Sequence, residues 1–422
     1  MTAAQLSVAF FLQMFVILAA ARVVGSFARR FGQPQVVGEM IAGVLLGPSL
    51  FGYFAPELQA HLFPKDSLKV LYVGAQLGVG LYMFLVGVDF KTELFRSRAK
   101  SAAAVSISGM VVPFGLGALL AIWLVGVPNL FSAKATTLEA MLFLGAAMAI
   151  TAFPMLARII YERGLTGTSL GTLALAAGAI DDAAAWCVLA IVLASFGDGP
   201  MVAVKAIAGG IAYGVVITTL GTKLLKPLGD MVEREGKLSN TVLGIVLMLF
   251  MLAAWMMDAI GIHAVFGGFL LGVAMPRGAL TRELQKQLEP ITVVLLLPMF
   301  FTFSGLNTRL DMVNSWQMLA IALVVLLAAC LGKGVACWAA ARATGQDNRT
   351  ALAVGSLMNA RGLMELIILN IGLSKGLIQA GLFSIMVLMA IVTTLMASPL
   401  FEWVYGRHAR ASGKLGETQN PG

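Results

Sequence analysis

Two adjacent aspartates, Asp181 and Asp182, stand at the centre of an otherwise apolar run, LALAAGAIDDAAAWCVLAIVLA (173–194). A carboxylate in the middle of a bilayer costs about 2.5–3.5 kcal/mol on insertion scales, so such residues usually mark a function. Burial and a like-charged neighbour both favour the protonated form of a carboxylic acid. The pair could therefore bind either protons or a hard cation, and a site that holds one or the other exchanges them. A purely structural role, as a helix cap or salt bridge, is the alternative.

A single lysine, Lys333, interrupts a second apolar run, LLAACLGKGVACWAA (326–340). It lies too far from either end of this run to reach water easily by extending its side chain. We expect Lys333 to be the counter-charge of the aspartates, either within a working site or in a structural salt bridge only.

A third charged pair, Arg361 and Glu365, lies in the segment SLMNARGLMELI (356–367). Residues four apart share one face of a helix, so the two side chains are expected to pair there. A structural pairing is the favoured interpretation, and gating or electrostatic tuning of a site is the alternative.

Two segments carry residues that interrupt a helix. In AMAITAFPMLAR (147–158), Pro154 removes a backbone donor and strains the preceding turn. In the 356–367 segment, Arg361 and Gly362 interrupt an apolar run. Non-helical backbone at membrane depth is tolerated only where protein surrounds it. We predict helix breaks in the membrane at Pro154 and Gly362, although proline and glycine are also common in ordinary membrane helices.

The elements that must position these residues are membrane helices. Hydrophobic residues make up 59% of the 422 residues and charged residues 12%, against about 25% charged in soluble domains. The sequence predicts an all-α polytopic membrane protein. Its N-terminus has no basic region, so we expect no cleaved signal peptide. Stretches of membrane-spanning length, about 17–25 residues, number thirteen: near 5–26, 36–51, 68–88, 101–126, 138–158, 167–196, 200–222, 238–257, 260–276, 288–306, 315–341, 350–374 and 378–403.

The positions of lysine and arginine predict the orientation. With the N-terminus outside, 21 of the 29 basic residues face the cytoplasm and six face the outer side, as the positive-inside rule requires. The C-terminal tail, 407–422, is then cytoplasmic, and the excess of basic charge needs no nucleic-acid partner. No loop or tail is long enough for a soluble regulatory domain.

An internal repeat relates the two halves of the chain. VVGEMIAGVLLGPSL (37–51) resembles HAVFGGFLLGVAMP (263–276), and LYMFLVGVDFKTEL (81–94) resembles LPMFFTFSGLNTRL (297–310) in the same order. The offset of seven helices gives the copies opposite senses across the membrane, an architecture typical of secondary transporters. We predict one transmembrane domain, 1–406, with repeats over about 5–196 and 238–403 joined by a linker helix at 200–222.

The string ITAFPMLARIIYERGLTGTSLGTLALAAGAIDDAAAWCVLAIV (150–192) resembles the core of the monovalent cation:proton antiporter-2 family. This family includes NapA-type sodium/proton antiporters, Kef-type potassium efflux proteins and plant cation/proton exchangers. The motifs GIHAVFGGFLLG and NARGLMELIILNIGL are closest to the plant branch. The resemblance covers about 5–403. It implies an NhaA/NapA-like fold with crossed, unwound helices, a fixed dimerisation domain beside a mobile core, and a homodimer.

The resemblance also assigns roles. Asp182 matches the carboxylate that binds the transported cation or the proton, and it is the one expected metal ligand. Asp181 matches the acid that pairs with a lysine, and Lys333 matches that lysine. Thr151 falls where an unwound helix contributes oxygens near the ion.

Arg361 and Glu365 match polar positions on the other crossing helix and imply a role in the electrostatics of the site. The family resemblance leaves the ion open. Asp-Asp is typical of sodium antiporters, whereas the plant branch usually has Asn-Asp and Kef-type proteins a Gln-Asp or similar pair.

Together these patterns predict a secondary antiporter that exchanges Na⁺ or K⁺ for protons across a bacterial inner membrane, without a cofactor. A cation channel without obligatory proton coupling is the alternative. An enzyme is not expected, because the chain has no metalloprotease or phosphate-binding motif. The cysteines lie within apolar segments and suggest neither disulfides nor a metal site: Cys187, Cys330 and Cys337.

Overall fold

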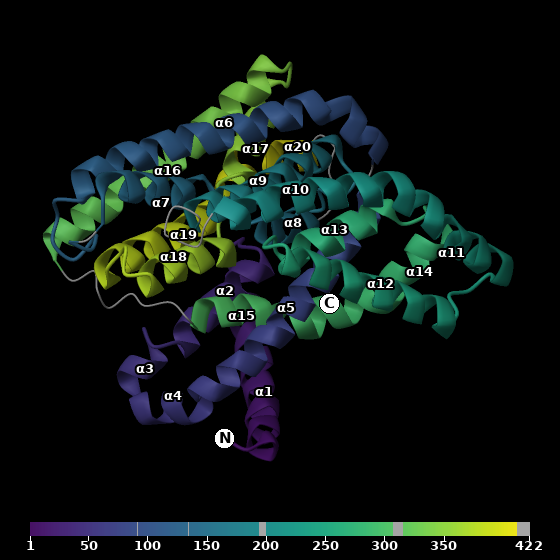
Figure 1. Ribbon diagram of the computed structural model, residues 1–422, viewed down its shortest axis with the longest axis horizontal. Helices are drawn as coiled ribbons and strands as arrows, with labels where there is room; N and C mark the ends of the chain where they lie inside the picture. Colours follow the sequence, from purple (N-terminus) through teal and green to yellow (C-terminus); the bar gives the residue numbers. More distant parts are fainter. Residues whose placement is uncertain (91, 134, 194–199, 307–314, 412–422) are drawn as a thin grey trace. The chain divides into compact units, whose positions relative to one another are not determined.

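The computed structural model describes residues 1–90, 92–133, 135–193, 200–306 and 315–411, which are nearly all helical (Figure 1). An isolated antiparallel bridge joins Phe131 and Ile378. Of the predicted tail, Arg407–Ala411 forms helix α20, and 412–422 lies outside the described residues. Residue 91 and residues 307–310 of the predicted repeat also lie outside them.

Within the described residues, 10 helical stretches are long and apolar enough to cross a membrane. They coincide with ten of the predicted spans, so the all-α polytopic class is confirmed, but the count of thirteen is not. The three remaining segments correspond to α9 (Ser169–Leu193), to the 11-residue α13 (Ala264–Ala274), and to the pair α17 (Asn348–Leu357) and α18 (Leu363–Ser374). The last segment is one predicted span with a helix break expected at Gly362, and the structure divides it between Leu357 and Leu363.

The chain forms two compact units, each assembled from segments far apart in the sequence. Unit 1 comprises Met1–Leu18, Pro64–Thr92 and Trp186–Phe300. Unit 2 comprises Ala19–Phe63, Glu93–Ala185 and Phe301–Gly422. Every residue proposed for a site from the sequence belongs to unit 2.

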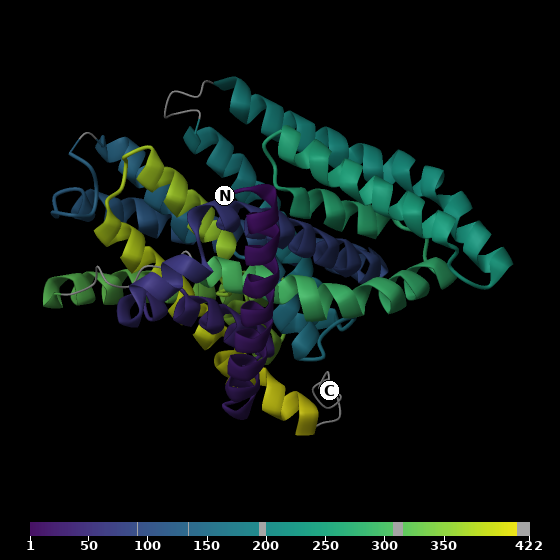
Figure 2. The ribbon, with the colours of Figure 1, turned by 90° about the horizontal axis from the view of Figure 1, so that it is seen from below.

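Unit 1 is built around α5 (Lys65–Asp89) and α13, which lie side by side (Figure 2). Glycines permit this contact, because a Cβ atom on Gly87 would lie 2.1 Å from the carbonyl oxygen of Phe269, and one on Gly272 would lie 2.1 Å from that of Phe84. Small residues allow such backbone-to-backbone packing in membranes. The other helices of this unit are α10 (Pro200–Val216), η2 (Ile217–Gly221), α11 (Thr222–Glu235), α12 (Asn240–Ala259), α14 (Ala279–Ile291) and η3 (Thr292–Leu296).

The predicted linker helix is longer than expected. α10 continues through the π-helical turn η2 into α11, so the helical run extends from Pro200 to Glu235 and not only to 222. Charges in α11 suggested a loop, but the helix is amphipathic and buries Leu225, Leu228 and Val232 on one face.

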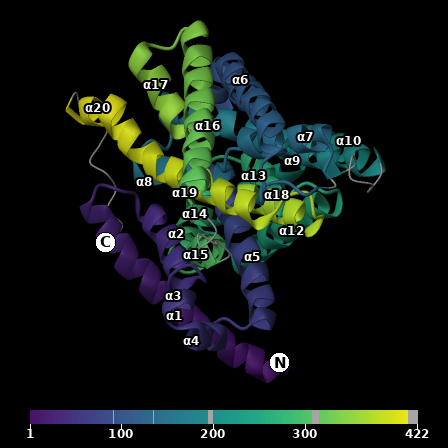
Figure 3. The same ribbon diagram turned by 90° about the vertical axis from the view of Figure 1, so that its left-hand side faces the viewer.

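Unit 2 contains the helices that surround the aspartates. α16 (Trp316–Ala343) and α17 form a hairpin, and α19 (Ala380–Phe401) packs against both (Figure 3). A Cβ atom on Gly355 would lie 2.5 Å from the carbonyl oxygen of Gly334, so the hairpin is held at backbone contact one residue after Lys333. The other helices of this unit are α2 (Gln35–Leu46), α3 (Phe51–Phe54), α4 (Pro56–Leu62), α6 (Thr92–Leu124), α7 (Thr137–Ala149), α8 (Phe153–Glu162), α18, η4 (Glu402–Gly406) and α20. The helices α1 (Ala3–Arg30) and α15 (Leu297–Leu306) begin in unit 1 and end in unit 2, whereas α9, which carries Asp181 and Asp182, begins in unit 2 and ends in unit 1.

Candidate ion site at two broken helices

Two broken helices meet in unit 2. α7 ends at Ala149 and α8 begins at Phe153, while α17 ends at Leu357 and α18 begins at Leu363. The intervening backbones contact each other directly, because the amide of Ala152 donates to the carbonyl oxygen of Ala360 at 3.1 Å. The unwound backbone thus satisfies part of its own hydrogen bonding inside the protein, as it must at membrane depth.

The predicted helix breakers lie at these breaks, with one difference. Gly362 is the N-cap of α18, and a Cβ atom there would lie 3.3 Å from Cβ of Ala152 in the facing break. Pro154 does not disrupt a helix. It lies in the first turn of α8, where a missing N–H costs nothing and the fixed φ favours helix initiation. The break therefore precedes the proline, at 150–152.

Two buried cationic side chains cap the C-terminal end of α7, where the last carbonyl groups have no partner within the helix. The guanidinium of Arg361 donates to the carbonyl oxygen of Met148 at 2.8 Å and to those of Ala147 and Ile150 at 3.3 and 3.5 Å. The Nζ of Lys333 donates to the carbonyl oxygen of Ala149 at 2.5 Å. A helix C-terminus carries partial negative charge and unsatisfied carbonyls, so both charges stabilise the break.

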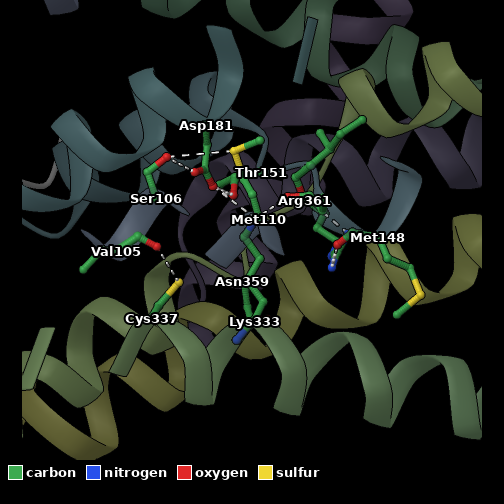
Figure 4. Close-up of polar contacts among 12 residues, drawn as sticks. Val105, Ser106, Met110, Met148, Thr151, Asp181, Lys333, Cys337, Asn359 and Arg361 are labelled. Atoms are coloured by element: carbon green, nitrogen blue, oxygen red, sulfur yellow. Dashed lines mark hydrogen bonds and ion pairs between the residues drawn. The ribbon is translucent and has the colours of Figure 1, made fainter. Parts of the chain in front are cut away.

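Asp181 is held by three donors from three different elements. Ser106 of α6 donates to one carboxylate oxygen at 2.5 Å, and Thr151 in the α7–α8 break donates to the other at 2.7 Å. Nζ of Lys333 lies 3.1 Å from that second oxygen, and both charged side chains are fully buried (Figure 4). Asp181 is therefore a compensated charge in this structure.

Asp182 is equally buried but has no such partners. Its exposed fraction is zero, and neither carboxylate oxygen has a hydrogen-bond partner among the described residues. A buried ionised carboxylate without a partner is strongly unfavourable, so the arrangement around Asp182 favours neutralisation of its charge. In the described part of the chain, no group of three or more His, Cys, Asp or Glu residues could hold a metal ion.

Glu365 and Arg361 pair less closely than the sequence suggested. The prediction placed both on one helix face, but Arg361 precedes α18 and its guanidinium is engaged by α7 carbonyls. The two charges remain an ion pair at 3.7 Å, and neither Glu365 oxygen accepts a hydrogen bond from any residue that the structure describes. Arg361 is thus mainly a cap for the broken helix.

Sequence reasoning missed Ser106 and the four carbonyl groups at the end of α7. Serine is common in the small-residue stretch SAAAVSISGM (101–110), and nothing in its spacing separates Ser106 from its neighbours. Backbone carbonyls have no residue type at all. The charge of Arg361 was the available signal, because a buried cation requires acceptors.

Comparison with known proteins identifies the family to which this chain belongs. The family model described as "Sodium/hydrogen exchanger, transmembrane" matches residues 15–405. The chain is 40% identical over 397 residues to the Na(+)/H(+) antiporter NhaS4 of Synechocystis, covering 93% of this chain and 96% of that protein. It is 34% identical over 415 residues to Cation/H(+) antiporter 18 of Arabidopsis thaliana, covering 96% of this chain and 50% of that one. The chain therefore spans about half the length of this plant relative.

A solved structure shares the fold. The sodium proton antiporter MjNhaP1 of Methanocaldococcus jannaschii superimposes with a TM-score of 0.68 over 100% of both chains, at 14% identity. The predicted antiporter fold and family are confirmed by the match over residues 15–405 and by the 40% identity over nearly the whole of a relative. This multi-pass membrane protein belongs to the sodium/hydrogen exchanger family.

Proposed function

We propose that this protein is a secondary antiporter that exchanges a monovalent cation, Na⁺ or K⁺, for protons by alternating access, with Asp182 as the shared site. The observation that carries the proposal is the contrast between two adjacent buried acids. Asp181 has three partners, whereas Asp182 has none among the described residues. The names of the relatives, which are antiporters of cations against protons, support the same function.

The geometry suggests how exchange works at the site. A proton or a desolvated cation neutralises Asp182, and because one carboxylate holds either species but not both, binding of one releases the other. Thr151 supplies a hydroxyl oxygen beside the pair, and Arg361 holds the end of α7 in place. Alternating access then requires the occupied site to face each side of the membrane in turn.

Transport in everted membrane vesicles tests this function directly. Addition of Na⁺, K⁺ or Li⁺ to vesicles with an imposed proton gradient is expected to release protons with at least one of these ions, at a rate that depends on pH. A channel would carry the cation without dissipating the proton gradient in an electrically shunted vesicle. Such uncoupled flux would refute the antiport mechanism.

We also propose a location and an orientation. The distribution of basic residues supports a bacterial inner membrane, with the N-terminus outside and the C-terminus in the cytoplasm. A reporter fused to the C-terminus that is active only in the cytoplasm is expected to be active. An inactive reporter on a protein that is inserted and transports would reverse the orientation.

A homodimer is the proposed assembly, with α1 at its interface. Large apolar side chains follow one face of this helix and are more than half exposed: Val8, Phe11, Phe15, Val23 and Phe27. A fixed dimer would hold one part of each protomer still while another part moves. Native mass spectrometry from a mild detergent is expected to give twice the mass of one chain, and a mass of one chain in lipid nanodiscs as well would contradict the dimer.

The site also predicts the charge moved in each cycle. When a cation occupies Asp182, the Asp181–Lys333 pair is expected to open and Lys333 to lose its proton, so two protons exchange for one cation and transport responds to voltage. Flux in liposomes with a clamped potential measures this response. The matched variant Lys333→Arg keeps the charge but cannot release a proton, so its flux is expected to be insensitive to voltage. Voltage-insensitive flux in the wild type would exclude the two-proton scheme.

A further inference from the structure

A second buried cluster of charges lies in unit 2, where α2 contacts α8. Glu39 of α2 is fully buried, and Arg158 and Glu162 of α8 are 1% and 8% exposed. The Nε of Arg158 donates to Glu162 at 2.7 Å, one turn along the same helix. The cluster contains two acids and one base, the same composition as Asp181, Asp182 and Lys333.

The two acids of this cluster are bound unequally. Glu162 accepts from Arg158 and from the first amides of α2, with one oxygen bonded to the Gln35 amide and the other 3.3 Å from the Val36 amide. Its charge therefore caps the positive end of α2. Glu39 accepts at Oε1 from the Gln35 side chain at 3.1 Å, and its Oε2 has no hydrogen-bond partner among the described residues.

The charged groups around Glu39 are two arginines and one acid, and none of them donates a hydrogen bond to Oε2 in the described part of the chain. Arg158 and Glu162 face it from α8, and Arg22, an exposed residue of α1, is the remaining charge that acts on it. From α15, the hydroxyl of Thr302 donates to the Glu39 carbonyl, not to its carboxylate. Gln35 Oε1, an atom that can only accept, also has no hydrogen-bond partner in the part of the chain that the structure describes. A proton on Glu39 would neutralise the group and turn an unsatisfied acceptor into a donor.

We propose that Glu39 forms a second proton-binding site, separate from Asp182, at the contact between α2 and α8. As a control on transport this inference rests on the proposed antiport function. Ionised Glu39 is attracted to Arg158 and repelled by Glu162, both on α8. It competes with Glu162 for the single arginine that pairs with it, so losing the proton weakens the pairing of the residue that holds the N-terminus of α2 and loosens the α2–α8 contact. α8 is the second half of the broken helix that carries Thr151, and Arg158 lies about 10 Å farther along it at 1.5 Å per residue. Proton occupancy of Glu39 thus acts on the element that forms the ion site.

The substitution Glu39→Gln imitates the protonated state of this residue at every pH, so it tests how the proton on Glu39 affects the rate of exchange. We expect the exchange rate of this variant to match that of the wild type at acidic pH. At alkaline pH its exchange rate should be about fivefold lower, the scale of a modest like-charge interaction. Glu39→Asp keeps a titrating group and should retain the pH dependence. Glu57→Gln, at an exposed acid of α4, is the matched control and should follow the wild type throughout.

A ratio of Glu39→Gln to wild-type exchange that does not change with pH would overturn the inference. If the wild type itself shows no exchange, the proposed function fails instead. Proton binding by Glu39 can then still be tested by a measurement that does not depend on transport. Infrared difference spectra between acidic and alkaline pH should show a protonated-carboxyl band in Asp182→Asn. That band should decrease in the double variant Asp182→Asn/Glu39→Gln, and an unchanged band would show that Glu39 does not bind a proton.

Discussion

Replacing Asp182 by asparagine is expected to abolish cation-dependent proton exchange while the protein remains folded and inserted. The amide keeps the shape of the side chain but removes the charge and the titrating proton. Loss of the ionic partner of a desolvated charge typically costs about 3–5 kcal/mol, which corresponds to a loss of about 100-fold or more in cation affinity. Proton release on cation addition in everted vesicles measures the effect.

The folded state of Asp182→Asn should be at least as stable as that of the wild type, because the variant removes a buried acid that has no hydrogen-bond partner in the described residues. Size-exclusion elution and melting temperature in detergent check this point. Asp182→Glu is the matched variant that retains the charge, and some exchange should survive in it. Wild-type exchange by a well-folded Asp182→Asn protein would show that another group carries the ion.

Replacing Lys333 by alanine is expected to destabilise the protein severely. The substitution leaves Asp181 charged and buried without its cation and removes one donor from the end of α7. Breaking a buried ion pair from one side typically costs about 3–5 kcal/mol. The melting temperature in detergent should therefore fall by several degrees more than in Lys237→Ala, a control at an exposed loop lysine.

A double-mutant cycle separates the ion pair from the other contacts of Lys333. Asp181→Asn alone frees Lys333 but leaves its bond to Ala149. The variant with both Asp181→Asn and Lys333→Met should lose less stability than the two single substitutions together, because it leaves no buried charge unpaired. Strictly additive losses, or equal melting temperatures for Lys333→Ala and Lys237→Ala, would contradict an energetically significant pair.

Much of the architecture was predictable because a bilayer imposes strong and simple constraints on composition. Low charge content and recurring apolar stretches require membrane helices, and the polytopic class and family are confirmed. The interruptions near Pro154 and Gly362 were visible because both residue types disturb or end helices. The number of spans was less predictable, since α13 and the α17–α18 pair include helices shorter than a bilayer.

The sequence by itself determined that five charged residues must be buried in the membrane, because all of them stand in apolar runs: Asp181, Asp182, Lys333, Arg361 and Glu365. Only the tertiary structure decided which acid is compensated. Ser106, Thr151 and Lys333 come from three elements far apart in the chain and all reach Asp181. Which donor reaches which acid depends on proximity in space and not on spacing in the sequence. The carbonyl groups that hold Arg361 belong to the backbone, which every residue type provides.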